Sequence, residues 1–231
     1  YYSLWALALY TIFKLVLLYR EKRQILAIAR PGVLTCYGVL VGVLLSLIQF
    51  YPGYNYTTNF SPRADSKRGW EWATSWSMHQ EEAFSLLVPE FAGAVTKDNK
   101  SFYWGKNYFK DNSESCGAVA IFLALIAAFF AKRREAYFFA GLALLALIYA
   151  LGDTTPVYKL FFYVVPLVKS LRAPSMIMFL FTFSVALLSG MALQHVLAGK
   201  RGTGKSERNF TYLLFGFPAF MGLLALAFAA S

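Results

Sequence analysis

Two neighbouring carboxylates, Glu81 and Glu82, follow Trp76 and His79 in the stretch SWSMHQEE. Such carboxylates can orient a hydroxyl or hold a cation, and an imidazole can transfer a proton. The same residues also allow a structural interpretation, because acidic side chains in the first turn of a helix stabilise the helix dipole. A histidine at such a place is often only a polar surface residue. All four are candidate site residues, and the elements that carry them decide between the two interpretations.

Arg172 is a second kind of candidate, a cation directly before an apolar segment in the run LRAPSM. Pro174 suits the first turn of a helix, which places Arg172 beside the free N–H groups of a helix N-terminus. A guanidinium and a helix N-terminus together favour an anion, such as the phosphate of a lipid-linked substrate. The alternative is an arginine that only extends to the lipid headgroups.

The composition indicates a membrane protein. Hydrophobic residues make up 58% of the 231 residues and charged residues only 15%, against about 25% charged residues in a soluble domain. Neither Cys36 nor Cys116 has a spacing to another Cys or His that is typical of a metal site, so no metal motif is predicted. The chain begins and ends inside apolar runs, and we expect it to be an internal piece of a longer membrane protein.

Six apolar runs are long enough, or nearly long enough, to cross a bilayer, which takes roughly 20 residues. We therefore predict an all-α, polytopic helical membrane domain over residues 1–231. The predicted spans are Tyr1–Tyr19, Val33–Tyr51, Gly117–Ala131, Ala136–Leu151, Met176–Leu197 and Phe210–Ala230. The third and fourth are short and are joined only by the sequence KRRE, which predicts a tight helical hairpin.

The loops between these runs differ in charge. Residues 20–30, 132–135 and 199–209 hold eleven basic and three acidic residues, a net charge of +8 out of +10 for the chain. Residues 52–115 hold seven basic and eight acidic residues. Since basic loops stay in the cytoplasm, we predict that the first three loops are cytoplasmic and that residues 52–115 and 152–175 lie outside the cell membrane. The basic composition then reflects topology and anionic membrane lipid, and no nucleic acid is expected as a partner.

Both outer segments predict short helices. Ser77 and Gln80 have the form of a capping box, which predicts a helix over residues 78–88 that packs on the bundle or lies in the interface. Thr155 and Pro156 are typical of an N-cap and a first helical residue. Pro166 should end this second apolar helix, which is too short to cross the membrane and is therefore expected to be re-entrant or interfacial.

The segment Gly199–Ser206 matches the phosphate-binding pattern GxxxxGK[ST]. That pattern binds a nucleotide only between a strand and a helix of a soluble α/β core. Here an apolar span is predicted on either side. We therefore expect no nucleotide at this segment and interpret it as a flexible, positive cytoplasmic turn.

Several short motifs, in the same order, resemble motifs of the bacterial YfhO family of polytopic membrane proteins. They are Trp76–Ser77 with Glu81–Glu82, Pro89–Gly93, Tyr103–Gly105, Ser113–Glu114, Leu151–Gly152 with Thr155–Pro156, and Leu171–Pro174. The resemblance implies a glycosyltransferase-C-like fold and an enzyme that takes a sugar from a polyprenyl-phosphate donor at the outer face. It also implies that the acidic catalytic residues lie in an earlier outer loop, so the catalytic residues stay unknown.

The favoured function is therefore transfer of a lipid-linked sugar in cell-envelope glycosylation. Arg172 would hold the phosphate, and Glu81 or Glu82 would orient an acceptor hydroxyl or a divalent metal ion; no cofactor is assigned. A lipid or polysaccharide transporter or flippase is one alternative, and it should carry polar groups inside its spans. The polar groups that the spans offer, mostly near their ends, are Lys14, Gln49, Gln194 and His195. A non-catalytic membrane scaffold is the other alternative.

Overall fold

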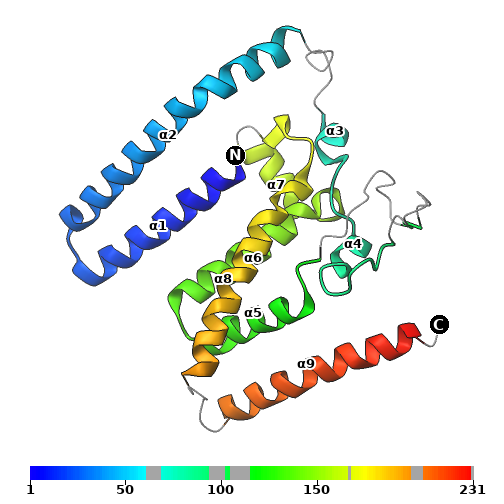
Figure 1. Cartoon of the computed structure of the whole chain (residues 1–231). Coiled ribbons are helices and arrows are strands. Elements are labelled where there is room, and N and C mark those ends of the chain that lie inside the picture. Colours follow the sequence, from blue (N-terminus) through cyan, green and yellow to red (C-terminus); the bar gives the residue numbers. More distant parts are fainter. Residues whose placement is uncertain (61–68, 94–101, 105–114, 166–167, 199–204, 230–231) are drawn as a thin grey trace. The chain divides into compact units, whose positions relative to one another are not determined.

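The computed structural model describes residues 1–60, 69–93, 102–104, 115–165, 168–198 and 205–229. Within these residues every regular element is a helix (Figure 1). The chain divides into two compact units, Tyr1–Trp72 and Ala73–Ser231, and the short helix α3 (Trp70–Thr74) lies at their division. The predicted all-α class is thus confirmed for this part of the chain.

The first unit is a helical hairpin. Helix α1 (Tyr2–Lys22) and helix α2 (Ile25–Asn59) are joined by a two-residue turn, in which Arg23 has the left-handed conformation with a φ of 54°. Helix α2 continues through Pro31 and Pro52 and so extends beyond both ends of the predicted span Val33–Tyr51. A longer helix is favourable in an apolar environment because its backbone groups bond to one another.

The second unit is built around a bundle of three helices. Helices α5 (Ala118–Phe130) and α6 (Arg134–Ala150) form the predicted tight hairpin, and α8 (Met178–Leu197) packs against both. Small side chains fill much of the contact, and such residues let helix backbones approach closely in a membrane. The buried small residues of these helices include Ala124, Ala127, Ala136, Ala143, Ala146, Ala150, Ser184 and Ala192.

Helix α9 (Lys205–Ala229) packs on α5 through pairs of aromatic rings. The ring centroids of Phe122 and Phe217 are 4.9 Å apart, and those of Phe130 and Phe210 are 5.2 Å apart. With α9 included, each of the six predicted apolar spans lies largely within one helix of the described chain.

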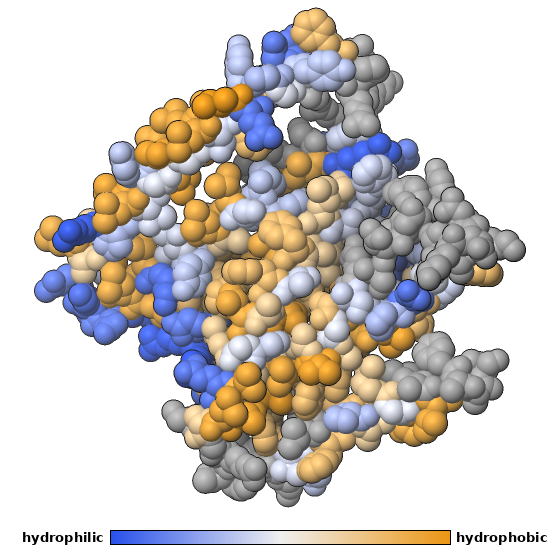
Figure 2. All heavy atoms as spheres, viewed as in Figure 1, coloured by the Kyte–Doolittle hydropathy of each residue, from blue (hydrophilic) through white to orange (hydrophobic). Residues whose placement is uncertain are grey.

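Three of these helices are long and apolar enough to cross a membrane. They cover Tyr2–Lys22, Ile25–Tyr56 and Pro174–Leu197, the last of which joins the 3₁₀ turn η3 (Pro174–Ile177) to α8. Figure 2 shows apolar side chains over much of the visible surface of the helices. Extended exposed apolar surface marks a face that contacts lipid or a partner. The structure is thus compatible with membrane insertion, and the count of six spans stays a prediction.

The two ends of the bundle differ chemically. One end carries the basic α5–α6 turn, where Arg133 Nη1 donates a 2.7 Å hydrogen bond to Gln194 Oε1 near the end of α8. The C-terminus of α6 and the N-terminus of α8 lie at the other end, together with the turns η1 (Gly152–Thr154) and η2 (Val168–Ser170) and helix α7 (Val157–Val164). The described residues of the predicted outer segment 152–175 therefore lie at the end of the bundle opposite the basic turn.

Helix α5 covers only part of the length of the bundle. Ser189 Oγ lies 2.8 Å from the carbonyl oxygen of Ala120, so the start of α5 is level with the middle of α8. At 1.5 Å per residue, α8 extends roughly 13 Å beyond the start of α5. Cys116 Sγ lies 3.9 Å from the Leu86 carbonyl oxygen just before α5 begins. The segment around Leu86 is thus placed at the level where α5 starts.

The first predicted short helix is shorter than expected. Helix α4 is Gln80–Phe84, not residues 78–88, and its N-cap is His79 instead of Ser77. The capping-box prediction for Ser77 and Gln80 was wrong because the Ser77 hydroxyl makes a buried tertiary contact, described below. Glu82 completes the box in place of Gln80, since its Oε2 accepts the His79 N–H at 2.9 Å.

The second predicted short helix starts one residue later than expected. Helix α7 has Pro156 as its N-cap, so the assignment of Thr155 as N-cap was wrong. The Thr155 hydroxyl lies 3.4 Å from the carbonyl oxygens of Ile148 and Gly152, which satisfies the end of α6 instead. Pro174 does stand in the first turn of η3, as predicted. Pro166 and residues 199–204 of the phosphate-binding pattern lie outside the described residues.

Cysteine accessibility tests the predicted orientation. We expect a cysteine at exposed Gln80 to react with an impermeant maleimide in intact cells, in a chain whose Cys36 and Cys116 are replaced by Ala. A cysteine at exposed Arg134 should react only after permeabilisation, because a basic turn stays in the cytoplasm. The reverse labelling pattern would place the candidate residues on the cytoplasmic side.

Candidate functional site

The two predicted outer segments meet at the end of the bundle opposite the basic turn. The Met78 N–H donates to the Ala150 carbonyl oxygen at 2.8 Å, and the Asp153 N–H donates to Ser77 Oγ at 3.4 Å. The Ser77 hydroxyl in turn donates to the Thr74 carbonyl oxygen at 2.7 Å. We call this contact the clasp. It consists of Ser77, Met78, Ala150, Gly152 and Asp153.

Gly152 gives the clasp its close fit. Its φ of +53° lies in the left-handed region, which costs a residue with a side chain about 1–2 kcal/mol. A Cβ atom at this position would overlap Ser77 Oγ, and Ser77 is fully buried. Glycine therefore lets the chain turn out of α6 and makes room for Ser77 in the same place.

Arg172 holds the neighbouring part of the same segment. Its guanidinium carbon lies 4.7 Å from the centroid of the Trp76 ring, and its Nε donates a 3.0 Å hydrogen bond to Ser75 Oγ. A cation above an exposed aromatic ring gains about 0.5–1 kcal/mol. The structure thus brings together two residues, Arg172 and Trp76, that the sequence suggested separately. Arg172 stays exposed, so its terminal nitrogens can still meet an anion.

Glu82 is a structural carboxylate. It is only 3% exposed, and its two oxygens accept different donors. Oε2 accepts the His79 N–H at 2.9 Å, and Oε1 accepts the Tyr103 hydroxyl at 2.6 Å. Hydrogen bonds to a charged group are stronger than neutral ones, so Glu82 ties the start of α4 to residues 102–104.

Glu81 and His79 differ from Glu82 in what they offer to a ligand. Glu81 is partly exposed and lies on another side of α4, because neighbouring helical residues point about 100° apart. His79 Nδ1 is buried and has no hydrogen-bond partner among the described residues. Of the adjacent pair, Glu81 is therefore the carboxylate that a ligand can reach.

Aromatic contacts fix the segment that follows α4. The ring centroids of Phe84 and Phe91 are 5.3 Å apart, and those of Phe91 and Trp104 are 5.7 Å apart. Trp104 Nε1 also donates a 2.9 Å hydrogen bond to the Phe91 carbonyl oxygen.

The hydrogen-bond partners Tyr103 and Ser75 were not predicted as site residues. For Tyr103 the one signal was its place in a motif of the family resemblance, and no sequence pattern pointed to Ser75.

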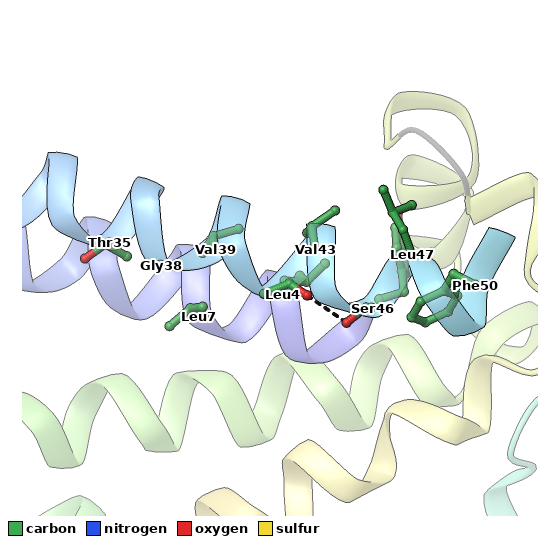
Figure 3. A pocket seen from close by; sticks show the side chains of 11 residues that line it. Leu4, Leu7, Thr35, Gly38, Val39, Val43, Ser46, Leu47 and Phe50 are labelled. Carbon is green, nitrogen blue, oxygen red and sulfur yellow. Dashed lines mark hydrogen bonds between the residues drawn. The ribbon is translucent and has the colours of Figure 1, made fainter.

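Other parts of the described chain do not add a catalytic cluster. No group of three or more His, Cys, Asp or Glu side chains that could hold a metal ion occurs among the described residues. A groove of about 740 Å³ lies between α1 and α2 (Figure 3), but it is mainly apolar. The hydroxyls of Thr35 and Ser46 at this groove donate to carbonyls of their own helix, at Pro31 and Gly42. The groove therefore suits an apolar occupant better than a reacting group.

Comparisons with protein-family models, with curated proteins and with solved structures found no match for this chain. Function is therefore inferred from the clasp, from the candidate side chains around it and from the motif resemblance.

Replacement of Gly152 tests the clasp. We expect Gly152→Ala to lower the free energy of unfolding by about 2 kcal/mol or more, through left-handed strain and the overlap with Ser77. Thermal unfolding of the purified chain in detergent measures the effect. Gly141→Ala in α6 is the matched control, because a Cβ there meets no atom within 4 Å. Additional Ser77→Gly should partly restore stability, and an unchanged melting temperature in Gly152→Ala would contradict the clasp.

A double-mutant cycle tests the structural role of Glu82. Glu82→Gln and Tyr103→Phe should each destabilise the chain by about 1–3 kcal/mol, because each leaves a buried polar group with fewer partners. The double variant should show coupling, since the two side chains share one hydrogen bond. Glu81→Gln is the control and should stay within about 0.5 kcal/mol of the wild type. Strictly additive effects would show that the Glu82–Tyr103 bond does not contribute to stability.

Proposed function

We propose that the chain is part of a multi-pass protein of the cell membrane, similar to the YfhO family, that transfers a sugar from a polyprenyl-phosphate donor at the outer face. The observation that carries the proposal is the position of Arg172. This exposed guanidinium is oriented by Trp76 and Ser75 beside the N-terminus of a helix that is long enough to span a membrane. Such a place is where the phosphate of a membrane-embedded lipid would be met.

The chemistry of the donor fits this arrangement. The acceptor hydroxyl gives its proton to a carboxylate base, and its oxygen bonds to the anomeric carbon of the sugar while the bond from that carbon to the phosphate oxygen breaks. The electron pair of the broken bond stays on the lipid phosphate, whose negative charge rises in the transition state. A fixed cation that lies beside this phosphate stabilises the charge as it develops. Arg172 would supply that cation, and its planar fork matches two phosphate oxygens.

Glu81 is the second part of the proposal. A partly exposed carboxylate can accept a hydrogen bond from the acceptor hydroxyl and orient it, or it can hold a divalent metal ion. Glu82 does not suit this role, because both of its oxygens accept hydrogen bonds from the protein. We therefore assign the orientation of the acceptor to Glu81 and the orientation of helix α4 to Glu82.

The transporter alternative has less support. Transport through the bundle would require polar groups that face its interior. In the described residues, Gln194 bonds to Arg133 at the basic end of the bundle, and the contact faces of α5, α6 and α8 are mostly alanine and other apolar residues. A scaffold without a ligand would show the same clasp, so measurements of binding and of sugar transfer are needed to separate it from an enzyme.

Binding of undecaprenyl phosphate to the purified chain tests the role of Arg172. Arg172→Ala should weaken binding roughly tenfold or more, because a hydrogen bond to a charged group contributes about 1.5–3 kcal/mol. Arg172→Lys should give an intermediate loss of affinity, since lysine keeps the positive charge but lacks the two parallel N–H donors of the guanidinium. Arg134→Ala at the basic end is the control and should bind as the wild type does. Equal binding of undecaprenol, which lacks the phosphate, would refute the proposal.

Sugar transfer in membranes that contain the full-length protein tests the role of Glu81. With a radiolabelled polyprenyl-phosphate sugar as donor, Glu81→Gln should raise KM for the acceptor or lower kcat, and it should leave binding of undecaprenyl phosphate unchanged. Glu90→Gln is the control, because Glu90 is an exposed carboxylate outside α4. If Glu81→Gln and Arg172→Ala both transfer sugar normally, neither residue takes part in the transfer and the clasp is only structural. If the wild type itself transfers no sugar, the scaffold alternative is favoured.

A further inference from the structure

Helix α7 has an apolar face that the bundle does not cover. Tyr158 and Phe162, four residues apart, are buried on one side of the helix, where it packs on α6. On the opposite side, Leu160 is 62% exposed, Tyr163 is 69% exposed and Val164 is 68% exposed. The helix is thus attached to the protein by one side and presents large apolar side chains on the other.

Two lysines lie along one edge of this face. At about 100° per residue, Lys159 projects between the buried side of α7 and its exposed side. Lys169 reaches the same edge from η2, since its Nζ lies 5.6 Å from the ring centroids of both Phe162 and Tyr163. Both lysines are exposed. The chain contains no Asp or Glu between residues 154 and 206, so this part of the sequence carries a net positive charge.

The position of α7 relative to α8 indicates the depth at which it lies. The membrane-length helix Pro174–Leu197 begins only ten residues after α7 ends at Val164. The contacts of α7 are with the C-terminal end of α6 and with η1 and η2, all at the same end of the bundle. When α8 crosses the bilayer, α7 therefore lies where the hydrocarbon meets the headgroups.

We propose that this surface is an interfacial binding site for anionic phospholipid. It consists of Val157, Lys159, Leu160, Tyr163, Val164 and Lys169. The apolar side chains enter the outer part of the acyl layer, and the two ammonium groups reach the lipid phosphates on flexible stems. Tyr163 fits the same depth, because tyrosine concentrates at membrane interfaces. The charge complementarity and the depth favour a lipid over a protein partner. The site goes beyond the proposed transfer reaction, since it includes neither Arg172 nor Glu81.

Fluorescence quenching in vesicles tests the proposal with the whole chain. Leu160→Cys is labelled with an environment-sensitive NBD probe in the chain whose Cys36 and Cys116 are replaced by Ala, and Gln80→Cys serves as the comparison site. The probe at position 160 should be quenched several-fold more by a lipid nitroxide near the headgroup than the probe at position 80. The quenching should increase when phosphatidylglycerol replaces phosphatidylcholine in the vesicles.

The lysines provide the matched variants. Lys159→Gln with Lys169→Gln should remove most of the response to phosphatidylglycerol, because each lysine near an anionic surface contributes about fivefold to the binding equilibrium. Arg134→Gln at the other end should keep the full response. Quenching at position 160 by aqueous iodide as strong as at position 80 would overturn the proposal. So would protection from both iodide and lipid nitroxides, which indicates a protein partner, or a lysine variant that responds as the wild type does.

Discussion

The close approach of Ser77 to the turn at Gly152 is the contact on which the end of the bundle opposite the basic turn depends. Two segments about 75 residues apart in the chain meet there through one backbone and one side-chain hydrogen bond. The contact requires a left-handed residue without a side chain at position 152 and a small hydroxyl at position 77. Once these two residues are in place, Ser75 and Trp76 necessarily lie next to the turn, within reach of Arg172. The clasp therefore positions the candidate anion site without contributing a reacting group itself.

The length of α5 explains why a polar segment can fold against an apolar bundle. Because α5 begins level with the middle of α8, the half of the bundle farther from the basic turn lacks its third helix. Residues 73–93 lie at that end and bring their own buried side chains, including Met78, Leu86 and Ala92. Some of their polar groups are satisfied within the segment, as the capping of α4 by Glu82 shows. In a membrane, an irregular backbone is tolerated only where protein or a polar cavity surrounds it.

The adjacent glutamates Glu81 and Glu82 differ in role, although they lie in the same helical turn. Burial and two hydrogen bonds commit Glu82 to holding α4 and Tyr103 in place. Glu81 is rotated by about 100° and stays partly exposed. A buried carboxylate that lost these donors would be costly, so the two positions are not interchangeable. Cationic groups at this end also differ in what holds them. Trp76 and Ser75 orient Arg172, whereas Lys169 lies against the rings of Phe162 and Tyr163.

The sequence by itself determined the helical class, the approximate position of every long helix in the described residues and the separation of the basic turn from the segments around Ser77 and Gly152. These features follow from runs of apolar residues and from charge, which act locally along the chain. It also suggested Arg172, Trp76, Glu81, Glu82 and His79, and it predicted the proline in the first turn before α8. It did not determine the ends of α4 and α7, the partner of Ser77 or the role of Glu82. A hydroxyl or a carboxylate can cap its own helix or bond to a distant segment with similar energy, and only the tertiary structure, through Gly152 and Tyr103, decided between the two.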